Sequence, residues 1–218
     1  MDTRVKPAYD DDMTLISAPV RAELVRAYAA PDRHYHGSRH IEALLGLAAQ
    51  YADAIADRDA VEAAIWFHDA IYDTRRRDNE ERSAALATAR LAGTTAHDRI
   101  ARIAAMIRAT AGHTVPTFAD ARAAQDCALF LDMDLAILGS EAAAFDAYVQ
   151  AVRREYDWVP EPQWIAGRRA VLAGFLARPA IYATAPFRVS HEAAARRNLA
   201  QALARLGEAA DPGAPDRT

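Results

Sequence analysis

The spacing of apolar residues constrains this chain more than any other feature of its sequence. Apolar side chains recur every three or four positions, whereas the strict alternation of apolar and polar residues that marks β-strands is nearly absent. Glycine and proline, which interrupt helices, number only 9 and 10 in 218 residues. The pattern therefore predicts an all-α protein.

Helix-breaking and capping residues divide the chain into about nine predicted helices. Their approximate ranges are 14–29, 36–54, 58–73, 78–91, 95–111, 120–138, 140–156, 160–178 and 190–206. Asp78, with Glu81 three residues later, has the pattern of a capping box, and Ser140 and Ser190 are predicted N-caps.

The chain contains no internal repeat and no long linker, so residues 13–207 are predicted to form a single compact helical domain. We expect residues 1–12, which are polar, to be a flexible N-terminus. We expect residues 208–218, which are rich in Asp, Pro and Gly, to be a disordered tail.

Composition excludes several classes of protein. The formal net charge of −4 argues against a dedicated nucleic-acid or anionic-membrane binder. Cys127 is the one cysteine, which excludes an intramolecular disulfide and a thiolate metal cluster. The start has no apolar signal-peptide core, and no apolar run approaches the ~20 residues needed to span a bilayer. A cytoplasmic protein is expected, and a homodimer is compatible with the sequence.

Histidines and acids gather in two segments of the N-terminal half. His36 and His40 are four residues apart, so they share one face of a helix. His68 and Asp69 follow the strongly apolar run 63–67. An ionised carboxylate is costly to bury unless it is paired or metal-bound, and an imidazole beside a carboxylate suits a divalent cation. A solvated helix end is the alternative interpretation of this pair.

A third segment, 130–138, is apolar except for Asp132 and Asp134. Two positions correspond to about 200° around a helix, so the two carboxylates are expected to face different ways. At least one of them is therefore expected to point inward, where a bound metal would account for it.

The three segments occur in the order His, then His-Asp, then Asp, and on a helical background this order resembles the HD superfamily of metal-dependent phosphohydrolases. The chain is most similar to an uncharacterised bacterial branch of that superfamily, usually described only as predicted metal-dependent phosphohydrolases. The resemblance covers residues 20–205, and the stretches that carry it are Tyr35–His40, His68–Tyr72, Asp78–Ala84, Asp132–Gly139 and Arg154–Tyr156.

The resemblance implies a set of metal ligands. They are His40, His68, Asp69 and Asp134, with Asp132 as the alternative for the last position. Mixed nitrogen and oxygen ligands fit Mn²⁺, Mg²⁺, Fe²⁺, Co²⁺, Ni²⁺ or Zn²⁺. His113 is the candidate for an additional ligand if two metals bind.

The resemblance also implies an activity, the hydrolysis of a small phosphate ester, for example a nucleotide, by metal-activated water. The segment around His36 is similar to one in cyclic-nucleotide phosphodiesterases, which makes His36 the candidate general acid. His36 and Asp69 are the residues expected to be essential for catalysis.

Further side chains are candidates for supporting roles. Asp73 and Glu80 are acids that would position water or support the ligands. Arg39 is a candidate for binding the substrate phosphate, as are Arg33 and Arg82. The aromatic residues Trp164 and Phe175 are interpreted as members of the core or of an interface.

Two other functions remain open at the level of the sequence. The first is a non-catalytic helical module that keeps a metal for structural or ligand-binding purposes. The second is an HD oxygenase with two irons, which needs more ligands than the four named above.

Overall fold

The computed structural model describes residues 15–210, and within this range every regular element is helical. The prediction of an all-α protein with about nine helices is confirmed. In chain order the elements are α1 (Ala18–Tyr28), α2 (Ser38–Gln50), the 3-10 helix η1 (Ala52–Ala54), α3 (Arg58–Phe67), α4 (Asn79–Leu91), α5 (His97–Ala109), α6 (Ala121–Asp134), the 3-10 helix η2 (Leu135–Gly139), α7 (Ala142–Glu155), α8 (Glu161–Leu176) and α9 (Ala185–Ala210).

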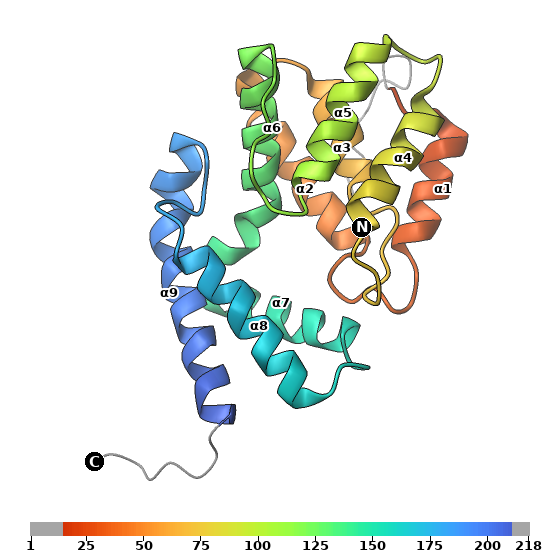
Figure 1. Cartoon of the computed structure of the whole chain (residues 1–218). Coiled ribbons are helices and arrows are strands. Elements are labelled where there is room, and N and C mark those ends of the chain that lie inside the picture. The colour runs from red at the N-terminus through yellow and green to blue at the C-terminus, as the bar shows by residue number, and fades with distance from the viewer. Residues whose placement is uncertain (1–14, 211–218) are drawn as a thin grey trace, which may run out of the picture.

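The helices form two groups that are joined by α6. In the first group α3 packs against α2, α4 and α5, and in the second α8 packs along α9. Helix α6 contacts α2, α3 and α5 and then continues into η2, which contacts α7 and α9. Figure 1 shows α1 to α5 on one side, α7 to α9 on the other, and α6 between them. The end of α6 is therefore where the two groups meet.

Helix α3 lies at the centre of the first group. The Asp57 carboxylate accepts a hydrogen bond from the Ala60 backbone N–H at 3.1 Å and so caps the helix. Alanines at three positions let neighbouring helices approach closely, and the buried residues of α3 are Ala60, Val61, Ala63, Ala64, Ile65 and Phe67. Because α3 is buried along most of its length, the residues that follow its last turn lie inside the protein.

The third helix ends at Phe67, whereas the sequence pattern predicted an end near Asp73. After Phe67 the chain turns and is held by Ser83 of α4. The Ser83 hydroxyl accepts from the Ile71 backbone N–H at 3.0 Å and lies 3.3 Å from the Ile71 carbonyl oxygen. This tertiary contact replaces the next helical turn, so His68 and Asp69 lie just beyond the helix.

Two predicted helix starts also differ from the structure. Helix α9 begins at Ala185 rather than at Ser190, whose hydroxyl donates to the Pro186 carbonyl within the helix. Helix α7 begins at Ala142, and Ser140 precedes its N-cap. Asp78 is the N-cap residue of α4, as predicted, but its side chain makes no capping hydrogen bond because the carboxylate pairs with Arg76 instead.

The two predicted terminal segments are only partly described. Helix α9 continues to Ala210, so the chain is still helical at Glu208, where the tail was predicted to begin. The predicted N-terminal segment 1–12 and residues 211–218 lie outside the described residues. Among residues 15–210, none of the helices has the length and apolar character that a membrane crossing requires.

Candidate metal centre

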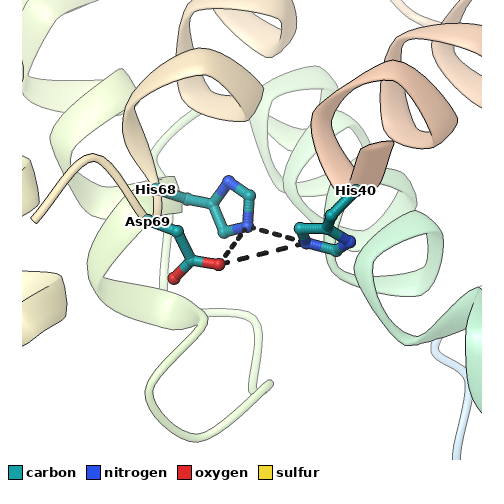
Figure 2. Close-up of side chains that lie close together, drawn as sticks. All are labelled: His40, His68 and Asp69. Atoms are coloured by element: carbon teal, nitrogen blue, oxygen red, sulfur yellow. Dashed lines mark hydrogen bonds and ion pairs between the residues drawn. The ribbon is translucent and has the colours of Figure 1, made fainter. Parts of the chain in front are cut away.

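Three ligand-type side chains meet at the junction of α2 and α3. His40 lies in the first turn of α2, and His68 and Asp69 follow the end of α3. The two histidine Nε2 atoms are 3.2 Å apart, and Asp69 Oδ2 lies 3.1 Å from Nε2 of His68 and 4.0 Å from Nε2 of His40. Figure 2 shows the three side chains pointing toward one another. This buried group could hold a metal ion.

The hydrogen bond made by Nδ1 fixes the orientation of the His68 ring. Nδ1 lies 2.8 Å from the Ile65 carbonyl oxygen, to which it donates as an N–H. Nε2 is therefore the atom that faces His40 and Asp69. A backbone carbonyl that accepts from the far nitrogen is the usual way in which a protein orients a metal-binding imidazole.

Arg33 joins the loop before α2 to the chain after α3. Its guanidinium donates to the carbonyl oxygens of Asp69 at 2.6 Å, Ala70 at 3.1 Å and His36 at 3.1 Å. Next to it, a Cβ at Gly37 would lie 3.2 Å from each of two backbone carbonyl oxygens, so this turn favours glycine. These contacts bring the two segments that carry the ligands together. Arg33 is thus a structural residue and not a free phosphate ligand.

Asp134, the last residue of α6, lies beside the group. Its Oδ1 is 3.1 Å from His40 Nε2 and 3.7 Å from His68 Nε2. Its other oxygen, Oδ2, lies 2.9 Å from Nε2 of His113. Asp134 therefore connects the two buried histidines to a third one, and the four predicted ligands lie in one cluster.

His113 has the one positive φ angle of any non-glycine residue in the described chain, 46°. Left-handed backbone is uncommon outside glycine and is concentrated at functional positions. Arg178 stabilises this turn by donating to the carbonyl oxygens of His113 at 3.2 Å and Gly112 at 2.8 Å. The turn places the His113 ring against Asp134, so the structure supplies a fifth ligand-type side chain at the cluster.

The protonation states show that the cluster is short of positive charge. Burial opposes protonation of His68, but the carboxylates of Asp69 and Asp134 outweigh it and raise its pKa to about 9. Burial lowers the pKa of His40 and so favours its neutral form. Against the effect of burial, the histidines hold the pKa values of both carboxyl groups well below their usual range. Two partly buried carboxylates thus lie beside one imidazole whose pKa is raised, and a divalent cation would add the positive charge that balances them.

A second pair of titratable groups adjoins the cluster. Nδ1 of His36 lies 2.6 Å from Oε2 of Glu155. The other carboxylate oxygen of Glu155 accepts from the backbone N–H groups of Tyr35 at 2.6 Å and His36 at 2.9 Å, and Tyr72 donates its hydroxyl to Oε2 at 3.1 Å. Burial works against protonation of His36, yet the hydrogen bond to Glu155 and the nearby carboxylates raise its pKa.

Sequence reasoning assigned no role to Glu155. The signal was present, because the apolar positions Phe145, Tyr148 and Val152 of α7 are spaced by four or three residues and the next position in that series is Glu155. A carboxylate on an apolar face requires a partner. The partners here are the loop before α2 and the His36 ring.

The ligand cluster and the ring of His36 border one cavity of about 550 Å³, which is large enough for a small organic ligand. His36, His68, Asp69, His113 and Asp134 line it on one side. The opposite wall comes from α7 and α8, so the cavity lies between the two groups of helices.

The remaining candidates lie apart from the cluster or at its edge. The Asp132 carboxylate accepts from the backbone N–H groups of Ala183 and Thr184, both at 2.7 Å, so it caps the segment before α9 and is not a metal ligand. Asp73 is exposed and accepts from the Arg75 backbone N–H. The pocket that Asp73 lines is bordered by neither His68 nor Asp134.

Two further candidates line cavities. Glu80 lines the cavity of the cluster, where it can act on water or substrate. Arg39 lines a second cavity of about 580 Å³, which it shares with His40 and Asp134. It therefore does not face the space that His36 and Asp69 line.

Comparisons of the chain with protein-family models, with curated proteins and with solved structures give no significant match. The chemistry of this site therefore follows from its own geometry. That geometry is a buried group of imidazole and carboxylate ligands, an adjoining His–Glu pair, and a cavity lined by His36 of that pair and by members of the ligand group.

Proposed function

We propose that this protein is a metal-dependent phosphohydrolase of the HD superfamily that hydrolyses a small phosphate ester. The observation that carries the proposal is the convergence of His40, His68, Asp69 and Asp134 beside a cavity that is also lined by His36, the hydrogen-bond partner of Glu155. Two imidazoles and two carboxylates suit a divalent transition metal or Mg²⁺, and four ligands leave positions open for water and substrate.

A divalent metal held by these side chains would activate water and neutralise charge on the phosphoryl oxygens. His36 is placed to act as the general acid. Its Nδ1 is hydrogen-bonded to Glu155, whereas its Nε2 has no hydrogen-bond partner among residues 15–210 and is free to hydrogen-bond to a substrate. The phosphorus–oxygen ester bond breaks as water attacks, His36 protonates the leaving oxygen, and the proton lost by the water restores His36.

Elemental analysis of the purified protein is the first test. We expect about one or two equivalents of divalent metal per chain, lost in His68→Ala and kept in His97→Ala, whose histidine is exposed at the start of α5. Metal that is equally abundant in both variants, or a site that fails to bind added Mn²⁺ or Mg²⁺, would contradict the proposal.

Phosphate release separates this function from the two alternatives. The metal-loaded protein should release phosphate from a panel of monoesters and diesters, and Asp69→Ala should abolish the release. A helical binding module would instead lose thermal stability in that variant without any activity to lose. Oxygen consumption with Fe²⁺ and no release of phosphate would indicate the oxygenase.

A further inference from the structure

Helix α8 presents two different faces. Ile165 and Leu172, seven residues apart, are buried on the side toward the core. Trp164, Arg168, Val171 and Phe175 are spaced by four, three and four residues, so they form one stripe, and all four line the cavity of the metal centre. Val171 is 48% exposed there, although it is a large apolar residue. Trp164 and Phe175 also contact neighbouring rings, those of Tyr156 and His113, but the stripe still forms part of the cavity wall and can contact a ligand there.

Arg168 is the one arginine or lysine among the residues that line this cavity. Its guanidinium donates to the Tyr148 hydroxyl at 3.0 Å and lies 5.2 Å from the centre of that ring. Within residues 15–210 it has no carboxylate at ion-pair distance, and its buried Nε has no hydrogen-bond partner. A guanidinium in this state is a ready binding group for a phosphoryl oxygen.

Aromatic contacts connect this stripe to the metal centre. Tyr148, which holds Arg168, stacks edge-on against Tyr35 at 4.6 Å, and Tyr35 lies 5.0 Å from the His40 ring. At the other end of the stripe, the ring of Phe175 lies 6.0 Å from that of His113. A ligand of modest size can therefore contact the cluster and the stripe together.

We propose that this face of α8 selects the substrate, a phosphate ester whose organic part is an aromatic group. Arg168 binds the phosphoryl group, and the ring packs on Trp164, Val171 and Phe175. The apolar part of the stripe favours an aromatic ester over a sugar or glycerol phosphate, because hydroxyls packed against Val171 and Phe175 would find no hydrogen-bonding group there. The inference rests on the proposed function for the phosphoryl chemistry, but not for the binding of the ring.

Gly167 offers a way to test the site for the ring alone. It lines the cavity next to Arg168, and a Cβ built there meets no atom within 4 Å, so a side chain would project into the open space. Gly174, in the same helix, is equally unobstructed but does not line the cavity. Gly167→Leu therefore fills the site, and Gly174→Leu is its matched control. Arg168→Gln has a similar control in Arg169→Gln, which changes an exposed arginine.

The contribution of the phosphoryl group to binding and that of the aromatic ring can be measured separately. Calorimetry on the metal-loaded protein gives the affinities for methylphosphonate and benzylphosphonate. The pair differs only in the aromatic ring, and neither compound is hydrolysed. We expect benzylphosphonate to bind at least about tenfold more tightly to the wild type, since a buried ring contributes a factor of this size. Gly167→Leu should remove this preference, and Arg168→Gln should weaken both ligands by about tenfold or more. Neither control should change either affinity.

Equal affinities of the two phosphonates for the wild type, or no binding of either, would overturn the inference. So would an Arg168→Gln variant that binds both as the wild type does. The result is independent of catalysis. A preference for the ring in a protein that releases no phosphate would support this site and contradict the proposed function, and phosphate release without that preference would do the reverse.

Discussion

Metal binding to this protein should release one proton near neutral pH. The pKa of His68 is raised to about 9 by Asp69 and Asp134 in spite of burial, so at pH 7 its Nε2 carries a proton. That nitrogen faces the cluster and must lose the proton before it can bind a metal. His40 has a lowered pKa and is already neutral. One proton, and not two, is therefore displaced from the two buried histidines.

The size of the effect follows from the pKa of His68. At pH 7, about two units below that pKa, removal of the proton costs about 3 kcal/mol. The apparent metal affinity should therefore be about a hundredfold weaker at pH 7 than above pH 9, and should fall about tenfold for each unit of pH decrease in between. In the metal-free protein the same proton stabilises the fold below about pH 6.5, and this contribution is lost as the pH rises through 9.

Calorimetric titration with Mn²⁺ at pH 7 measures the proton directly. The observed enthalpy is compared in two buffers with very different ionisation enthalpies, and the slope gives the number of protons released. His97→Gln, which removes an exposed histidine, should give the same slope as the wild type. Equal enthalpies in the two buffers, or a metal affinity that does not change between pH 6 and pH 8, would refute the role given to His68.

Three further predictions address the neighbouring residues. His36→Asn should slow hydrolysis of alkyl phosphates by about a hundredfold but affect p-nitrophenyl phosphate far less, because that leaving group needs no proton; an equal loss on both substrates would argue against general acid catalysis. Glu155→Gln removes the partner that raises the pKa of His36, so the alkaline limb of the kcat–pH profile should shift to lower pH, and an unmoved limb would contradict that coupling. Asp132→Ala should lower the free energy of unfolding in urea by about 3 kcal/mol with no loss of bound metal, because the carboxylate caps the segment before α9. Metal loss at unchanged stability would place Asp132 in the cluster after all.

The helices were predictable because their signal is local. Apolar spacing and breaker residues depend only on near neighbours in the sequence, so α5 and α8 appear close to where the pattern places them. The errors occur where a distant residue decides the boundary. Ser83 ends the continuation of α3, and Asp132 caps the segment that leads into α9. Neither contact has a signature in the local sequence.

The candidate ligands were predictable for a different reason. His68, Asp69 and Asp134 interrupt or end apolar runs, and burial of such groups requires a partner. The same argument applies to Glu155, which continues the apolar face of α7 but was overlooked because α7 contains no histidine. This argument could not have identified Arg168. Its proposed role in binding phosphate depends on the absence of a carboxylate at ion-pair distance among the described residues. This absence is visible only once α8 is packed against the cavity.

The position of the ligands at helix ends adds an electrostatic contribution that no single side chain provides. His68 is the C-cap of α3, and Asp134 is the last residue of α6. The C-terminus of a helix carries a charge of about −0.5 from its unpaired carbonyl groups. The two carboxylates, with the C-terminal end of α3 beside them, make the electrostatic potential at the cluster negative, which favours a cation and repels a phosphoryl group. A phosphate ester can approach such a centre only if cations at the cluster or across the cavity offset the repulsion. In the proposed function, a metal held by the cluster would supply one of these cations, and Arg168, with no carboxylate partner of its own among the described residues, would supply the other.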